Sequence, residues 1–381
     1  FHDSQTRVAS TQTRMKGENR MRSVKTIIAG LVAAMLLSTG AFAGSDLNEV
    51  GALLVFPLIV AGGESTADTG LSNLETFVTI TNAGPNDVVL HVSYINGEEY
   101  SDQYCYECDF QIPMSGNDTE TLVITNGPTG THIVAEDLYL DMSCPWSKGM
   151  IVVALEDEDG MTITDNVLLG EEVIVNYAEG AAFSIPAIPF QGNTGDGNRE
   201  YKFDDAEYAK MPRIVAADFL APDIDKSGIA HLTLFTLGFE RQFPPLVDCS
   251  VIGFDANEHP FSGSFQFGCW STWDLCEISP EFCYPNLGLF NNDPHHPISD
   301  THGWLQLNCR VDVNPAAADG FEADGGVHGA LFQVQQGGFR MAPGSGAQFG
   351  SQAMWGRLLY QSVTTGDVVE LTLEGNPLGL D

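Results

Sequence analysis

The chain has 381 residues, 43% of them hydrophobic, and its 16 Lys and Arg are outnumbered by 51 Asp and Glu, which gives a formal charge of -35 at pH 7. This apolar content can form a large core and excludes a wholly disordered chain. The acidity argues against binding to nucleic acid or to anionic lipid headgroups, because both need clustered basic side chains. The 40 Gly and 19 Pro favour strands and turns over long helices.

The first predicted element is a secretory signal peptide that starts at Met21. Basic residues near its start precede an apolar stretch at 27–37 and a small-x-small cleavage site at 41–43. The apolar stretch is too short for a membrane span, which needs about 20 residues. We therefore expect residues 1–43 to be an upstream read-through followed by the signal peptide. The mature protein would be secreted, periplasmic or at the cell surface, with no membrane insertion after cleavage.

Residues 44–190 are predicted to form an N-terminal β-rich domain. The apolar run 51–60 is typical of a buried strand that is interrupted at Pro57. Two alternating stretches, 75–82 and 88–95, flank a Gly-Pro-Asn-Asp turn and predict a β-hairpin. Further strands are expected at 120–125, 150–156 and 181–188, and residues 131–141 could form a short helix or a strand.

A polar, glycine-rich stretch at 191–210 predicts a linker or a long loop, and residues 211–381 are predicted to form a second β-rich domain. Strands are expected there at 213–219, 231–238, 251–254, 264–268, 303–307, 329–335, 354–361 and 367–373. Short strands with frequent turn signals are typical of β-sandwiches. The sequence therefore predicts an all-β, disulfide-bonded protein of two immunoglobulin-like or jelly-roll-like sandwich domains. The alternative is two halves of one large sandwich that meet near residue 200.

All the cysteines follow the predicted signal peptide: Cys105, Cys108, Cys144, Cys249, Cys269, Cys276, Cys283 and Cys309. An even number of cysteines in an exported chain indicates disulfides. Cys105 and Cys108 also have the spacing of a redox or zinc half-site, but no second such pair follows. We expect one of these two to pair with Cys144 and at least two of the C-terminal cysteines to pair. Because each half holds an odd number of cysteines, complete pairing requires at least one bridge between the halves.

Two acidic segments are candidates for calcium binding. Asp223 and Asp225 match the first half of a calcium loop, but Leu234 stands where an EF-hand needs a bidentate glutamate. A turn that binds calcium through the two aspartates therefore competes with a plain loop. The acidic run 156–160 is expected to be a solvated hairpin tip, with calcium binding as the alternative. No other cofactor is expected.

A histidine-rich stretch contains candidate ligands for a transition metal. His295, His296 and His302 lie close to two aspartates, although adjacent histidines rarely face one ion, and an exposed loop is the alternative. The sequence has no nucleophile-elbow, zinc-peptidase or phosphate-binding motif. In so acidic a chain, a carboxylate pair for glycoside hydrolysis can always be found and carries little weight. A secreted hydrolase is kept as an alternative without assigned residues.

Aromatic side chains are concentrated in a Cys- and Trp-rich insert. Trp270 and Trp273 lie in it, between Cys269 and Cys283. Exposed rings at the rim of a sandwich could stack on sugars, which would make the protein a carbohydrate-binding module. The alternative is that both tryptophans shelter disulfides within a long loop.

Several short motifs are similar to those of a family of exported bacterial β-sandwich proteins with no assigned activity. They are Phe56-Pro57-Leu58, Ile80-Thr81-Asn82, the strand leading to Asn96-Gly97, Cys144-Pro145, 169–172, 212–218 and 303–305. The resemblance implies an exported β-sandwich protein and assigns no catalytic or binding residue. We therefore expect an exported, non-catalytic structural or surface-interaction protein whose partner is a cell-surface glycan or protein.

Overall fold

The computed structural model describes residues 49–62, 74–127, 130–135, 140–157, 159–176, 181–194, 201–221, 228–237, 245–255, 258–283, 286–287, 302–312, 326–335, 352–357 and 359–360. These residues all belong to one compact unit, 47–381. The predicted signal peptide, Asp223, Asp225, His295, His296 and the expected strand at 367–373 lie outside the described residues. His302 is described only as a backbone position at the start of a strand. No helix in the described ranges is long and apolar enough to cross a membrane.

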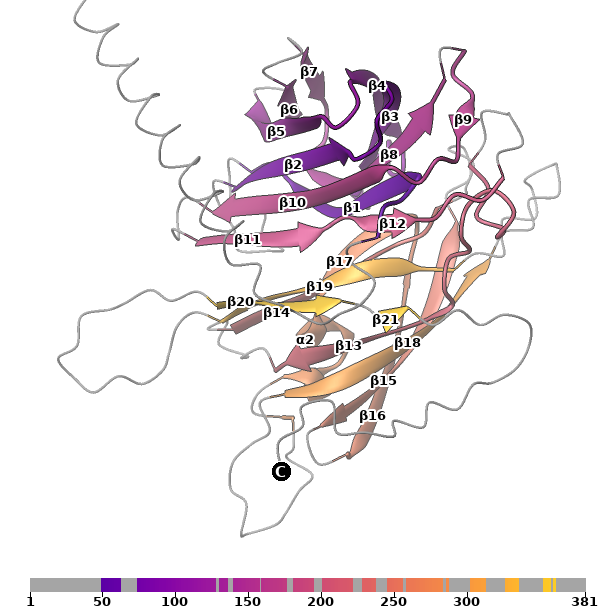
Figure 1. Ribbon diagram of the computed structural model, residues 1–381. Helices are drawn as coiled ribbons and strands as arrows, with labels where there is room; N and C mark the ends of the chain where they lie inside the picture. The colour runs from indigo at the N-terminus through magenta and orange to yellow at the C-terminus, as the bar shows by residue number, and fades with distance from the viewer. Residues whose placement is uncertain are drawn as a thin grey trace, which may run out of the picture. The chain divides into compact units, whose positions relative to one another are not determined.

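The first half of the chain forms two antiparallel sheets (Figure 1). Their strands are β1 (Leu53–Val60), β2 (Leu74–Asn82), β3 (Val88–Asn96), β4 (Glu107–Met114), β5 (Thr119–Gly127), β6 (Gly130–Ala135), β7 (Leu140–Cys144), β8 (Lys148–Glu156), β9 (Thr162–Ile163), β10 (Leu168–Asn176), β11 (Ala181–Pro186) and β12 (Ile188–Phe190). Sheet 1 has the order β12-β1-β8-β3-β4, with β9 beside β8, and sheet 2 has the order β11-β10-β2-β5-β6-β7.

The second half adds two more antiparallel sheets. Its elements are β13 (Ile214–Leu220), β14 (Gly228–Phe235), β15 (Leu246–Asp255), β16 (Pro260–Phe267), β17 (Trp270–Asp274), the short helix α2 (Leu275–Ile278), the 3-10 turn η1 (Pro280–Phe282), β18 (His302–Asp312), β19 (His328–Gln335), β20 (Gln352–Arg357) and β21 (Leu359–Tyr360). Sheet 3 has the order β16-β15-β18-β13-β21, and sheet 4 has the order β17-β14-β19-β20. The prediction of an all-β, disulfide-bonded chain is thereby confirmed.

Sheet 2 buries one face through alternating side chains, whereas β1 and β8 of sheet 1 are buried on both faces. In β2 the pattern of buried and half-buried residues has period two, so Val78 and Ile80 point into a core that also receives Leu90 and Val92 of β3. A second core lies between sheets 3 and 4. A fully buried aliphatic side chain contributes about 1.5–3 kcal/mol, so these two cores supply the main drive for folding.

The apolar run at 51–60 forms a strand that is irregular where the sequence predicts it. The register of β1 against β8 shifts between Phe56 and Ile59, on either side of Pro57. Proline has no backbone N–H and cannot donate to a regular ladder. The backbone groups released around Pro57 find partners elsewhere in the fold.

The predicted hairpin of 75–82 and 88–95 is wrong. Strand β2 pairs with β10 and β5 in sheet 2, whereas β3 pairs with β4 and β8 in sheet 1. The intervening turn therefore carries the chain from one sheet to the other. The side chain of Asn82 holds this turn, because its Nδ2 donates to the carbonyl of Asn86 and its Oδ1 accepts from the N–H of Gly84.

The segment predicted as a linker packs closely where the structure describes it. Tyr208 is 0% exposed, and Tyr201 and Phe203 pack against the same apolar cluster. The backbone of Gly192 forms a β-bridge with Tyr208. Residues 201–210 therefore cover apolar surface and do not behave as a solvated spacer.

Candidate functional site

The cysteines form four pairs. They are Cys105–Cys269, Cys108–Cys144, Cys249–Cys309 and Cys276–Cys283. The expected bridge to Cys144 is present, and the bridge from Cys105 to Cys269 joins the two halves of the chain. Because Cys105 and Cys108 have different partners, the redox or zinc half-site suggested by their spacing does not form.

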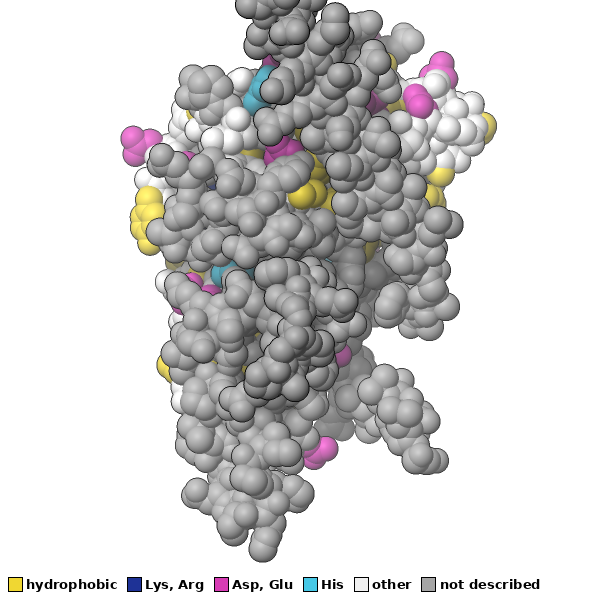
Figure 2. All heavy atoms as spheres, turned by 90° about the vertical axis from the view of Figure 1, so that its left-hand side faces the viewer, with side chains coloured by type: hydrophobic (Ala, Val, Ile, Leu, Met, Phe, Trp, Pro, Cys, Tyr) yellow, Lys and Arg dark blue, Asp and Glu magenta, His cyan; other side chains and the backbone are white. Residues whose placement is uncertain are grey.

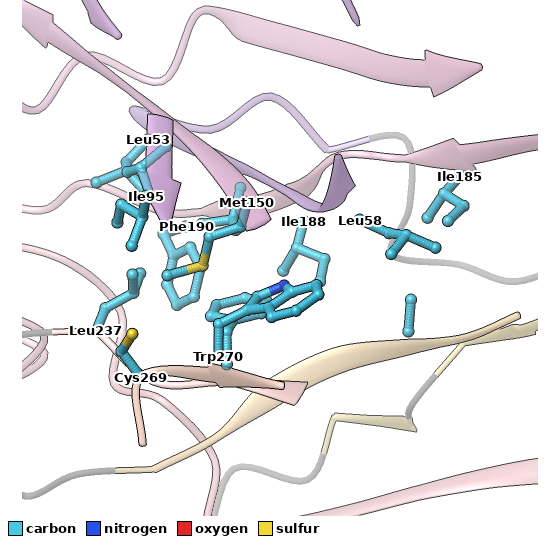
Figure 3. Packing of buried hydrophobic residues seen from close by; sticks show 14 of the residues in the cluster. Leu53, Leu58, Ile95, Met150, Ile185, Ile188, Phe190, Leu237, Cys269 and Trp270 are labelled. Carbon is cyan, nitrogen blue, oxygen red and sulfur yellow. The ribbon is translucent and has the colours of Figure 1, made fainter. Parts of the chain in front are cut away.

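Trp270 lies at the junction between the two halves of the chain, next to the Cys105–Cys269 disulfide that joins them. It belongs to a buried cluster, named here the junction cluster, that also includes Leu58 of β1, Met150 of β8 and Phe190 of β12 (Figure 3). The indole N–H of Trp270 donates to the carbonyl of Pro57 at 2.7 Å. A side chain from the second half thus satisfies the backbone that proline disturbs in the first.

This environment corrects the expected role of the tryptophan pair. Trp270 is 0% exposed, so its ring cannot stack on an external sugar. Trp273 is half-buried, and its ring packs against Phe265 and Phe267 at centroid distances of 4.7 and 5.4 Å. The expected long loop is corrected too, because both tryptophans lie on strand β17, Trp270 in the junction cluster and Trp273 against β16.

A buried glutamate completes the polar contacts behind β1. Oε1 of Glu172 on β10 accepts a hydrogen bond from the N–H of Leu58 at 3.2 Å, and the side chain is 0% exposed. Burial raises the pKa of Glu172 well above its ordinary value, because the charged form loses hydration. The Oγ1 atom of Thr76 also exchanges hydrogen bonds with the backbone of Val60. Both side chains thus form hydrogen bonds with backbone groups of the irregular strand β1.

A group of titratable side chains surrounds His91 on β3; with Asp109 and Glu156 it is named here the His91 cluster. Nδ1 of His91 lies 3.0 Å from Oε1 of Glu156, and Nε2 lies 3.6 Å from Oδ1 of Asp109. These two carboxylates raise the pKa of His91, Asp109 the more strongly, against the opposing effect of burial. Gln111 donates to the other oxygen of Glu156 at 3.0 Å. The arrangement favours the protonated form of His91, which lies between carboxylates of β4 and β8.

Two tyrosines border the His91 cluster on the side of the junction. The ring of Tyr201 meets that of His91 edge-on at 6.5 Å and that of Tyr208 at 6.1 Å. Burial raises the pKa of both phenols, and neighbouring carboxylates raise it further. Oε1 of Glu207 accepts a hydrogen bond from Thr162 at 3.0 Å. The His91 cluster therefore ties residues 201–210 to sheet 1.

The acidic tip differs from the expectation at its first residue. Glu156 is only 8% exposed and belongs to the His91 cluster. The tip itself is closed by Asp157, whose Oδ1 accepts from the N–H groups of Asp159 and Met161. Across the described residues, no three His, Cys, Asp or Glu side chains come together as a metal ion would require. Figure 2 shows described acidic side chains scattered over one face of the molecule.

An open surface of different character lies on the outer face of sheet 3, whose strands β15, β16 and β18 run side by side at the bottom of Figure 1. Every second residue of these strands points away from the core. The outward residues on the two central strands are Leu246, Asp248, Ser250, Ile252 and Phe254 of β15 and Trp304, Gln306, Asn308 and Arg310 of β18. We name this surface the sheet 3 face.

The cross-strand register arranges the sheet 3 face in rows. Phe254 lies opposite Trp304, and their rings stack at a centroid distance of 4.5 Å with an interplanar angle of 13°. The next rows pair Ile252 with Gln306 and Ser250 with Asn308. Aromatic residues thus occupy one end of the face, the exposed Ile252 lies beside Gln306 in the next row, and hydroxyl and amide side chains follow.

A shallow hollow lies at the other end of the sheet 3 face. Its volume is about 660 Å³, and it is lined by Asp248, Cys249, Ser250, Ser264, Phe265, Gln266, Asn308 and Arg310. The side chain of Gln266 donates to the carboxylate of Asp248, which holds both groups in place. Polar residues alternate with apolar ones over 304–310, which is a sequence signal for this surface. The higher aromatic content of the insert instead favours Trp270 and Trp273 as the predicted site.

Comparison with known protein families, curated proteins and solved structures found no match. The chemistry of the described residues is therefore the basis for assigning a function.

Proposed function

We propose that this chain is an exported, non-catalytic surface-interaction protein, built from two β-sandwich domains, that binds its partner through the sheet 3 face. The observation that carries the proposal is the composition of this face. Gln306 and Asn308 present amide groups beside Phe254 and Trp304 on regular strands. Within the described part of the chain, neither amide side chain has a hydrogen-bond partner. Such groups are available to a partner without breaking internal bonds.

Export is supported by two independent features of the chain. The segment that starts at Met21 has the charged, apolar and small-residue regions of a signal peptide. The eight cysteines form four disulfides, and disulfides persist in oxidising compartments. The resemblance to exported bacterial β-sandwich proteins points to the same localisation.

Two sandwich domains are supported by the distribution of the cores. One core receives side chains from sheets 1 and 2, and the other from sheets 3 and 4. Each sheet pair thus encloses apolar residues of its own, as in a β-sandwich. The junction cluster and the Cys105–Cys269 bridge connect the two domains to each other.

A binding role is favoured over catalysis by the position of the titratable groups. The His91 cluster is rich in such groups, yet its side chains contact one another beside the junction cluster. His91 and Glu156 connect neighbouring strands of sheet 1, and Tyr201 brings residues 201–210 against them. We propose that this cluster has a structural role, because it holds residues 201–210 against sheet 1 beside the junction cluster.

Binding to isolated cell envelopes of the producing organism tests the proposal. The mature, disulfide-bonded protein should be retained, and Gln306→Ala/Asn308→Ala should reduce retention by roughly tenfold, the cost of about two net hydrogen bonds. The matched control is Thr79→Ala/Thr121→Ala, which removes an exposed hydroxyl pair from the outer face of sheet 2. Equal retention of the two variants would show that the sheet 3 face is not the binding site.

Calcium is proposed as a stabilising ion without a catalytic task. The formal charge of -35 implies repulsion between carboxylates, and an ion that binds only the folded state stabilises it by mass action. Asp223 and Asp225 are the proposed ligands. Millimolar calcium should raise the melting temperature more than sodium chloride of equal ionic strength, and Asp223→Ala/Asp225→Ala should remove the difference. An equal rise in the two salts would indicate screening alone.

A further inference from the structure

We infer that the ligand of the sheet 3 face is a neutral, extended polysaccharide chain that lies along β15 and β18. This inference rests on the proposed function, because it names the partner of the same surface. It follows from the length of the face, from its aromatic end, from its hydrogen-bonding groups and from the charge of the chain.

The length of the face suits several consecutive sugar rings. Trp304, Gln306, Asn308 and Arg310 occupy alternate positions of one strand and point to the same side. With a rise of about 3.3 Å per residue, the distance from Trp304 to Arg310 is about 20 Å. A single monosaccharide would cover only part of this track, whereas an extended chain would contact all of it.

The aromatic end provides apolar surface of the kind that sugar rings contact. Phe254 and Trp304 are half-buried and lie parallel at 4.5 Å, so each supports the orientation of the other. Stacking of this kind fixes two large rings at little cost in conformational entropy. The C–H face of a pyranose packs on aromatic surface, while its hydroxyl groups point outward. On the neighbouring strand β13, the exposed Asp218 lies opposite Trp304 and places a carboxylate beside that position.

The centre of the face carries groups that match sugar hydroxyls. An amide side chain has two N–H donors and one carbonyl acceptor, and a serine hydroxyl both donates and accepts. A sugar hydroxyl likewise donates and accepts, so Asn308, Gln306 and Ser264 can bond it in either direction. Ser264 lies in the same row as Asn308, across Ser250, and it is exposed. The hollow at the Asp248 end extends this polar track.

The composition and charge distinguish this ligand from other classes. The net formal charge of -35 disfavours binding of acidic polysaccharides and nucleic acid. Interfaces with protein partners usually have an apolar centre and a polar rim. On this face the order is different, because serine and amide side chains lie in the middle, between Phe254, Trp304 and Ile252 at one end and Leu246 at the other. Small ligands bind in pockets that enclose most of their surface, whereas this hollow lies on the face of a sheet.

Retention on insoluble neutral polysaccharides and mobility in gels with soluble polysaccharides test the inference. The probes are cellulose, chitin, β-1,3-glucan and starch as neutral chains, and alginate and hyaluronate as anionic chains, with the mature disulfide-bonded protein. We expect binding to at least one neutral chain and to neither anionic chain at low salt. Gln306→Ala/Asn308→Ala should weaken that binding roughly tenfold to thirtyfold, whereas Thr79→Ala/Thr121→Ala should leave it unchanged.

A second variant keeps the test decisive if the alanine pair is unstable. Asn308→Asp keeps the size of the side chain but removes both amide donors, so it should weaken binding by roughly tenfold with an unchanged melting temperature. Absence of binding to every neutral chain, equal binding to the anionic chains, or full binding by both face variants would overturn the inference. If cell envelopes retain the protein through this face while no polysaccharide does, the ligand class is wrong and a protein partner is indicated. The proposed function would then stand.

Discussion

Replacement of Trp270 by phenylalanine should destabilise the protein by about 2–4 kcal/mol. The tryptophan is 0% exposed, and its indole N–H donates to the carbonyl of Pro57 at 2.7 Å. Phenylalanine cannot donate, and a buried acceptor that loses its donor costs about 1–3 kcal/mol. The smaller ring also leaves unfilled volume in the junction cluster, which adds about 1 kcal/mol. Because Pro57 lies in the first half of the chain, the same substitution weakens contact between the halves.

Urea unfolding of the disulfide-intact protein measures this loss through the free energy of unfolding extrapolated to water. The matched control is Trp273→Phe, which changes the same residue type only three positions further along the insert. Trp273 is half-buried and packs against Phe265 and Phe267, so we expect its replacement to cost less than about 2 kcal/mol. If Trp270→Phe costs no more than Trp273→Phe, the contact with Pro57 does not stabilise the junction and the reasoning is refuted.

Three further predictions concern the crossing disulfide and two titratable groups. Cys105→Ser/Cys269→Ser should lower the free energy of unfolding by about 5 kcal/mol in the chain-entropy model, because this bridge spans 164 residues. Alkylation of the wild type without reductant, followed by intact-mass analysis, should find no free thiol. Several alkylated thiols would contradict the pairing. The raised pKa of His91 means that its stabilising contribution is full below the unfolded pKa of about 6.5 and is lost as the pH rises through the folded pKa; His91→Gln should remove that step from a melting-temperature series, and an unchanged step would exclude His91 as its source. Glu172 has a raised pKa, so its contribution is greatest at low pH and falls as the pH rises above the unfolded pKa of about 4.3; Glu172→Gln should therefore be at least as stable as the wild type at pH 7, and a lower melting temperature would show that the charged form is needed.

Local sequence patterns predict the strands well because each strand must bury one face. The run ending at Val60 forms β1, and its irregularity falls at Pro57, where the ladder lacks an N–H. The expected strands at 120–125 and 150–156 likewise lie within β5 and β8. The parity of the cysteines requires a bridge between the halves, and Cys105–Cys269 is that bridge. These inferences need only the chemistry of neighbouring residues and counting.

The pairing partner of each strand is decided by tertiary structure. The alternation of 75–82 and 88–95 shows that each stretch has a buried face. The same alternation would arise if the two strands paired in one sheet or lay in two sheets that face each other across a core. They lie in different sheets, because β5 and β10 take the edges of β2 while β4 and β8 take the edges of β3. Strand pairing depends on residues far away in the chain, which a local pattern does not contain.

The exposure of each aromatic ring is decided in the same way. The sequence places Trp270 in a Cys- and Trp-rich insert and Trp304 in an expected strand, and neither position fixes the exposure of the ring. The fold buries Trp270 against Pro57, which lies 213 positions away, and leaves Trp304 half-buried on the sheet 3 face. Sequence alone determined an acidic, disulfide-bonded chain of alternating strands, since composition and periodicity are local properties. Only the packing of one half against the other decided which aromatic rings became core and which became surface, because burial depends on contacts between residues that are distant in sequence.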